Sequence, residues 1–115
     1  MEPEFHPKGW GNELWIVNNK KYCGKKLSFQ AKKRCSWHYH KIKDETFFVN
    51  SGRFIILYGF ADDIKLAKLT HLKVGDSLHI PPETRHQIIA IEDSVLYEFS
   101  TQHFETDSYR IIKGD

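Results

Sequence analysis

The sequence has few of the residues that hold small extracellular domains together. It contains only two cysteines, Cys23 and Cys35, in 115 residues, together with four prolines and one methionine. Two cysteines allow a single bridge, whereas small secreted domains that depend on disulfides carry a denser framework. We therefore expect two free thiols and a cytoplasmic location.

Long apolar runs are also missing. No segment approaches the roughly 20 consecutive apolar residues that a membrane span needs. The first ten residues, MEPEFHPKGW, have no apolar stretch typical of a signal peptide. These absences predict no membrane partner and no export signal. The length suits one compact unit, so we predict a single domain over residues 1–115.

The sequence has little excess of either charge sign, because 17 basic and 15 acidic residues leave a net charge of +2. Its distribution is uneven. Residues 1–43 hold ten Lys or Arg against three Glu, which gives +7, and residues 44–115 hold seven against twelve, which gives −5. We interpret the basic residues as a solvated face at turns and outward strand positions, and we predict no nucleic-acid partner. These residues are Lys20, Lys21, Lys25, Lys26, Lys32, Lys33 and Arg34.

What the sequence has in abundance is short apolar runs punctuated by turn residues. No window sustains the 3.6-residue period of an amphipathic helix, and the runs alternate with period two or are continuously apolar, which predicts an all-β chain. An open sheet of many short strands would leave long unpaired edges, so we expect two antiparallel sheets that stack or close into a barrel. The expected strands span residues 13–17, 25–29, 35–40, 46–50, 53–60, 65–70, 77–80, 85–91, 95–100 and 109–113.

Histidines gather in two segments. His38 and His40 lie two residues apart in an expected strand, so both imidazoles leave the same face and can converge on one ion. Such a pair is also common by chance on an exposed strand. Glu45 follows after four residues, and His86 follows a turn-rich stretch that begins at Gly75.

These two segments resemble the two sequence motifs of the cupin family. Residues 38–52 are similar to G-x5-H-x-H-x(3,4)-E-x6-G, and residues 75–86 are similar to G-x5-P-x-G-x2-H-x3-N. Three framing positions differ. Lys32 stands in place of the opening glycine, Glu83 in place of the glycine of P-x-G, and Ala90 in place of the final asparagine.

The resemblance implies a double-stranded β-helix, the cupin jelly-roll barrel, with one divalent transition metal inside it. The ion would be Mn, Fe, Ni, Co, Zn or Cu, because imidazole and carboxylate donors accept all of these. The positions that bind metal in cupins are occupied here by His38, His40, Glu45 and His86. Four protein ligands would leave two octahedral positions for water or a small-molecule substrate.

The flanks of the chain are similar to those of phosphomannose-isomerase-type cupins. The segment Lys8-Gly9-Trp10-Gly11 matches their opening apart from Gly9, which replaces a proline, and residues 98–110 match their ending. This similarity implies a sugar or sugar phosphate as substrate and isomerase or epimerase chemistry through a metal-stabilised enediolate. An Fe-dependent dioxygenase and a non-catalytic sugar-binding cupin are the alternatives.

Several polar residues are candidates for substrate chemistry. Glu98 is flanked by aromatic residues, and burial without a partner would raise its pKa and suit it as a catalytic base; the alternative is a position on the solvent face. His103 lies just beyond a strand, near the expected pocket mouth, and we assign it to substrate binding with Arg53 and Tyr97.

Strand parity predicts which side chains leave the barrel. If His38 and His40 face the lumen, then Cys35, Trp37 and Tyr39 point away from it, together with Phe48 on the next strand. So much outward aromatic area favours a homodimer. A terminal strand that folds over the same face is the alternative.

Overall fold

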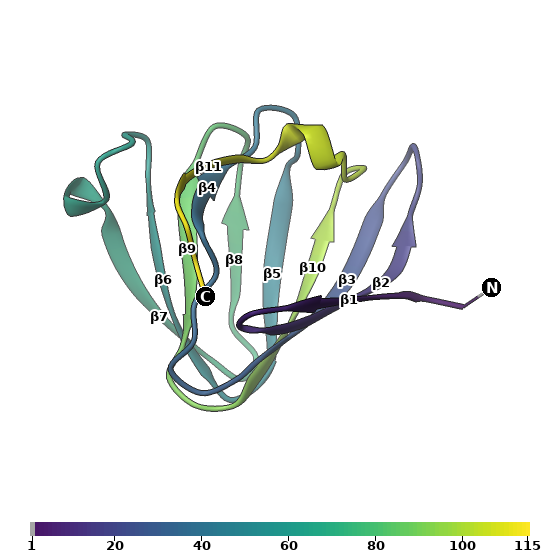
Figure 1. The fold of residues 1–115 in the computed structure, drawn as a ribbon, viewed down its shortest axis with the longest axis horizontal. Helices are drawn as coiled ribbons and strands as arrows, with labels where there is room; N and C mark the ends of the chain where they lie inside the picture. The colour runs from purple at the N-terminus through teal and green to yellow at the C-terminus, as the bar shows by residue number, and fades with distance from the viewer. Residues whose placement is uncertain (1) are drawn as a thin grey trace.

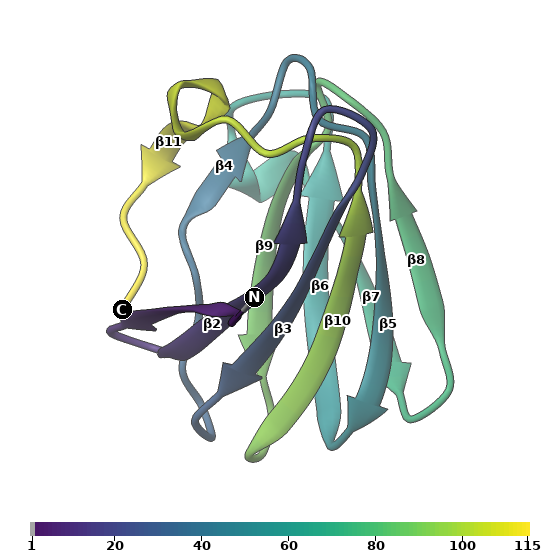
Figure 2. The same ribbon diagram turned by 90° about the vertical axis from the view of Figure 1, so that its right-hand side faces the viewer.

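Two antiparallel β-sheets face each other in the computed structural model, which describes residues 2–115 (Figures 1 and 2). The first sheet has six strands in the order β1 (Glu4–Lys8), β2 (Gly11–Asn18), β3 (Cys23–Phe29), β10 (Ser94–Ser100), β5 (Glu45–Ser51) and β8 (Ser77–Ile80). The second has five strands in the order β11 (Tyr109–Ile112), β4 (Trp37–Tyr39), β9 (Arg85–Ala90), β6 (Arg53–Gly59) and β7 (Lys68–Lys73). The all-β jelly-roll prediction is confirmed.

Helical structure in the described chain consists of two 3-10 turns, η1 (Ile64–Leu66) and η2 (Glu105–Asp107). The strand expected over residues 65–70 therefore begins later, at Lys68, because η1 occupies its first part. Strand β1 was not expected from the sequence. Within residues 2–115, no helix has the length and apolar character needed to cross a membrane.

Inward-facing side chains change from apolar to polar along the strands that enclose the lumen. On β3, the inward residues run from Phe29 and Leu27 to Lys25, and all three are buried. On β9, Ala90 and Ile88 lead to His86, which is likewise buried. Strands β5 and β10 follow the same order and end on Glu45 and Glu98. One end of the barrel is thus an apolar core, and the other end is lined by polar and charged side chains.

The strand parity expected for Cys35 is wrong. His38 pairs with His86, whereas Arg34 forms an isolated bridge with Ile89, so the register is offset by one residue between them. A one-residue offset of this kind reverses the alternation of side chains. The Cys35 side chain therefore turns inward, joins the apolar core and lines the cavity.

Trp37 does face away from the lumen, but it is not exposed. Its relative exposure is 0%, and its indole N–H donates to the carbonyl of Asp62, 2.8 Å away. The neighbouring Tyr39 carries the Arg85 guanidinium 3.8 Å above its ring and stacks on Tyr109 of β11. The terminal strand thus covers part of this face, as in the alternative raised from the sequence.

Two motif glycines are missing from the sequence, yet their backbone geometry is retained. Lys32 and Glu83 have φ angles of 67° and 72°, and they are the non-glycine residues with positive φ among residues 2–115. A Cβ in this region clashes with the adjacent carbonyl oxygen, which costs roughly 1–2 kcal/mol. Both turns are nevertheless held by hydrogen bonds, from Lys32 N–H to Ala90 and from Glu83 N–H to His40.

We predict that Lys32→Gly and Glu83→Gly each raise the free energy of unfolding, by up to about 1 kcal/mol, because glycine removes the Cβ clash at positive φ. Urea denaturation followed by circular dichroism measures the change. Gly75→Ala is the reciprocal control. Gly75 has a φ of 90°, and a Cβ added there would meet no neighbouring atom within 4 Å, so this variant should lose stability through backbone strain alone. Destabilisation by both glycine variants would contradict the prediction.

Candidate metal centre and its cavity

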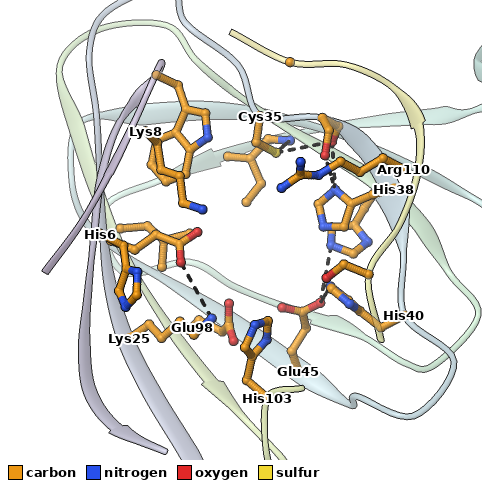
Figure 3. A pocket seen from close by; sticks show the side chains of 18 of the residues that line it. His6, Lys8, Lys25, Cys35, His38, His40, Glu45, Glu98, His103 and Arg110 are labelled. Atoms are coloured by element: carbon orange, nitrogen blue, oxygen red, sulfur yellow. Dashed lines mark hydrogen bonds and ion pairs between the residues drawn. The ribbon is translucent and has the colours of Figure 1, made fainter. Parts of the chain in front are cut away.

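Three imidazoles converge at the polar end of the lumen. His38 comes from β4, His86 from the cross-strand position on β9, and His40 from the residue that follows β4. Their candidate ligand atoms all lie within 4.8 Å of one another. Figure 3 shows His38 and His40 along one wall of a cavity of about 730 Å³ between the two sheets, and His86 lines the same cavity.

Each of these histidines is oriented through its Nδ1 atom by a backbone carbonyl. The Nδ1 atoms of His38, His40 and His86 lie 2.8, 2.8 and 2.9 Å from the carbonyl oxygens of Ser36, Asp107 and Thr84, respectively. A carbonyl only accepts, so each Nδ1 carries the proton and each Nε2 keeps a free lone pair. This is the arrangement in which metal-binding histidines are held.

Glu45 completes the donor set. Its Oε2 atom lies 3.5 Å from His40 Nε2 and 3.3 Å from His86 Nε2. The same oxygen is buried and has no hydrogen-bond partner within residues 2–115. A buried carboxylate oxygen left without a partner is costly. Three imidazole nitrogens beside such an oxygen fit a divalent transition metal.

The electrostatics keep the site ready to bind a cation. Burial lowers the pKa of His38 well below its usual range, and the adjacent His86 and His40 lower it further. Burial also lowers the pKa of His40, although the Glu45 carboxylate opposes this shift. Both rings are therefore neutral at pH 7, as metal ligands must be.

Asp107 holds the loop that joins His40 to Glu45. Its carboxylate oxygens accept hydrogen bonds from the backbone N–H groups of Lys41, Ile42 and Lys43, at distances of 2.9 to 3.2 Å. Its backbone carbonyl accepts the hydrogen bond from His40 Nδ1. Sequence reasoning missed this residue, although it lies within residues 98–110, the segment that matches the ending of phosphomannose-isomerase-type cupins.

Glu98 faces the lumen, where it forms a buried ion pair with Lys43. The Lys43 ammonium lies 2.9 Å from Glu98 Oε2, and Glu98 is only 4% exposed. Burial alone would raise the pKa of Glu98, but the charges of Lys43 and Lys25 outweigh it and hold this pKa at about 2. The raised pKa expected for a buried Glu98 without a partner therefore does not apply, because Lys43 is its partner.

Lys25 is buried, contrary to the expected solvent-facing position. Its ammonium lies 3.6 Å from Glu13 Oε1 and 4.3 Å from the centre of the Trp15 ring. The Trp15 indole N–H donates to the same Glu13 oxygen. A lysine on the inward-facing parity of β3 could have been recognised from the sequence, because Cys23, Leu27 and Phe29 share that face.

The three predicted substrate-binding residues lie in different places. His103 lines the cavity, with its ring edge-on to Trp15 at 5.1 Å, and burial together with the cationic Lys43 and Lys25 lowers its pKa to about 3. The structure does not bring Arg53 or Tyr97 to this cavity. Arg53 is exposed and pairs with Glu92, while Tyr97 faces outward on β10 and stacks near Phe99.

Known proteins resemble this chain in sequence pattern and in fold. A family model described as a cupin domain matches residues 26–99. A comparison of the sequence with curated proteins finds no match.

Solved structures share the fold at low sequence identity. The capsular polysaccharide assembling protein CapF from Staphylococcus aureus has a TM-score of 0.83 and 17% identity, over 96% of this chain and 32% of that chain. This chain thus spans about a third of CapF. KdgF from Halomonas sp. has a TM-score of 0.76 and 16% identity, over 90% of this chain and 89% of that one. An RmlC-like cupin from Shewanella frigidimarina NCIMB 400 has a TM-score of 0.76 and 19% identity, over 90% and 87%.

We predict that His86→Ala lowers metal affinity at least about 100-fold, because it removes one donor from a set held by the surrounding fold. Elemental analysis after dialysis against zinc measures metal per chain. His71→Ala is the matched control, since His71 lies on β7 outside the imidazole cluster. Glu45→Gln, which keeps the side-chain size, should also weaken binding. Retention of one zinc per chain by a folded His38→Ala/His86→Ala double variant would contradict the assignment.

Proposed function

This chain belongs to the cupin domain family, and we propose that it is a metal-dependent enzyme that acts on a carbohydrate or sugar phosphate by isomerase- or epimerase-type chemistry. One observation carries this proposal. Three imidazoles beside a carboxylate share a cavity with an ionised acid, Glu98, and a lysine, Lys43. Metal-assisted proton transfer needs a metal-binding group and a proton-transferring side chain in the same cavity.

The proposed ligands of the ion are His38, His40, Glu45 and His86, and the ion is one of Mn, Fe, Ni, Co, Zn or Cu. When bound, it would supply positive charge that stabilises the enediolate character developing on two adjacent substrate oxygens. CapF, a structural neighbour, is described as a capsular polysaccharide assembling protein. This description supports a sugar as the substrate class here.

Glu98 is the proposed base, and Lys43 sets its strength. A carboxylate whose pKa is about 2 is a weak base at neutral pH. The Lys43 ammonium causes much of this lowering through its charge and a smaller part through its hydrogen bond, so a substrate oxygen that takes up this hydrogen bond would let the Glu98 pKa rise by that smaller part. Substrate binding would thus strengthen the base at the moment it is needed. His103, on the same cavity wall, is proposed to contact the substrate.

The proposed location is the cytoplasm, which is supported by two buried free thiols, Cys23 and Cys35.

The proposed assembly is a homodimer. Trp37 no longer supports a dimer, because it is covered within the chain. The outer face of β5 and β10 supports it instead, where Phe48 and Phe99 are 38% and 56% exposed. Tyr97 extends the same aromatic surface.

We predict that Glu98→Gln slows exchange of a carbon-bound sugar proton with solvent deuterium by about 100-fold or more, the usual contribution of a positioned base. Proton NMR of a panel of aldoses, ketoses and sugar phosphates with the zinc- or manganese-loaded protein measures this rate. Metal content should be unchanged. Glu92→Gln is the control, because Glu92 is exposed and pairs with Arg53. If no sugar exchanges while the Fe(II) form consumes oxygen with a substrate, the oxygenase alternative replaces this proposal.

We predict a dimer mass in light scattering at micromolar concentration and a monomer mass for the Phe48→Lys/Phe99→Lys variant, because like charges on a buried apolar face oppose association. Circular dichroism should show an unchanged fold, since both side chains point to solvent. Lys65→Glu/Lys68→Glu serves as a charge-changing control, because both residues are exposed and lie on η1 and β7, away from the face of β5 and β10. A monomer mass for the unmodified protein would refute the dimer.

A further inference from the structure

We propose that Arg110 and Lys8 form an anion-binding subsite in the cavity, which selects substrates that carry a carboxylate or phosphate group. This inference rests on the proposed function, because it names the substrate class of the same cavity. Neither residue was assigned a role by sequence reasoning.

The cations that line the cavity fall into two groups. The inner two, Lys25 and Lys43, are buried and already neutralised by Glu13 and Glu98. Arg110, Lys8 and Lys113 also line the cavity, and none of them takes part in an ion pair within residues 2–115. Their charges are therefore available to a ligand.

Arg110 lies next to the metal centre by strand register. It is the cross-strand partner of His38 in the pairing of β11 with β4, so both side chains leave the same face of the sheet. Neighbouring strands are about 4.8 Å apart, which places the two residues within the span of one small ligand. Figure 3 shows the Arg110 side chain directed into the cavity from the wall that carries His38.

Lys8 lies on the opposing wall, and the fold holds that wall in place. A Cβ on the neighbouring Gly9 would overlap the backbone of Asp115, so the turn after β1 packs closely against the segment that follows β11. The residues that follow β1 and those that follow β11 are thereby in close contact. In Figure 3, the Lys8 ammonium points toward the space between the two walls.

Two acidic residues also line the cavity, but they do not neutralise Arg110 and Lys8. Glu105 and Asp115 line the same cavity, but neither forms an ion pair within the described chain. One Asp115 oxygen instead accepts the backbone N–H of Arg34 at 2.8 Å. A guanidinium presents paired donors that match the geometry of a carboxylate or phosphate, and a second ammonium across the cavity adds charge.

The test uses three probes of matched ring structure: glucose, glucuronate and glucose 6-phosphate. Each is titrated into the isotope-labelled protein, metal-free and zinc-loaded, while the backbone amide signals of the cavity residues are followed by NMR, which can be done in the same way for every variant. We expect a saturable shift with at least one anion and none with glucose. Arg110→Gln should weaken binding of that anion about tenfold or more, the effect of losing a charge-assisted hydrogen-bonded pair. Lys8→Gln should weaken it less.

Arg34→Gln is the matched control, because Arg34 is exposed and does not line the cavity. A response to glucuronate alone assigns the subsite to a carboxylate, a response to glucose 6-phosphate alone assigns it to a phosphate, and responses to both indicate the shared anion chemistry. The absence of a saturable shift with either anion, equal binding of glucose, or unchanged anion binding by Arg110→Gln would overturn the proposal.

The same titration separates this inference from the proposed function. Anion binding by a protein that takes up no zinc would support the subsite and refute the metal-dependent enzyme. Zinc uptake without any anion response would support the metal centre and refute the subsite.

Discussion

The candidate metal centre depends on three backbone carbonyl oxygens, which determine the nitrogen of each histidine that is left free. Ser36, Thr84 and Asp107 provide these oxygens, and each accepts the Nδ1 proton of one imidazole. If a carbonyl moved away, the ring could turn or change tautomer, and its Nε2 lone pair would no longer face the cavity. Asp107 has the largest effect, because its carboxylate also holds the loop between His40 and Glu45. A single buried residue thus positions ligands on both sides of that loop.

The period of two along a strand made much of this arrangement predictable. It placed His38 and His40 on one face, and both side chains line the cavity in the structure. Strand parity alone could not predict the cluster of three histidines, because the cluster joins residues 38 and 86. The resemblance to two family motifs supplied that link.

The remaining differences arise where local pattern does not determine the outcome. An offset between the Arg34–Ile89 bridge and the His38–His86 pair reverses the expected direction of Cys35, and nothing in the composition of this segment signals it. Parity alone also does not reveal what covers an outward residue, which is why it predicted a Trp37 free for a partner. The low pKa of Glu98 depends on Lys43, which is 55 positions away in the sequence.

The change from apolar to polar side chains along each lumen strand has a consequence for how such a barrel can diversify. Most of the folding free energy that comes from burial is concentrated in the apolar half, where Phe54, Ile56 and Leu96 are fully buried. Exchange of a side chain in the polar half removes little of that apolar contact, so new ligand sets can be tried there while the fold is preserved. The barrel thus separates the residues that stabilise the core from the residues whose exchange can alter the ligand set.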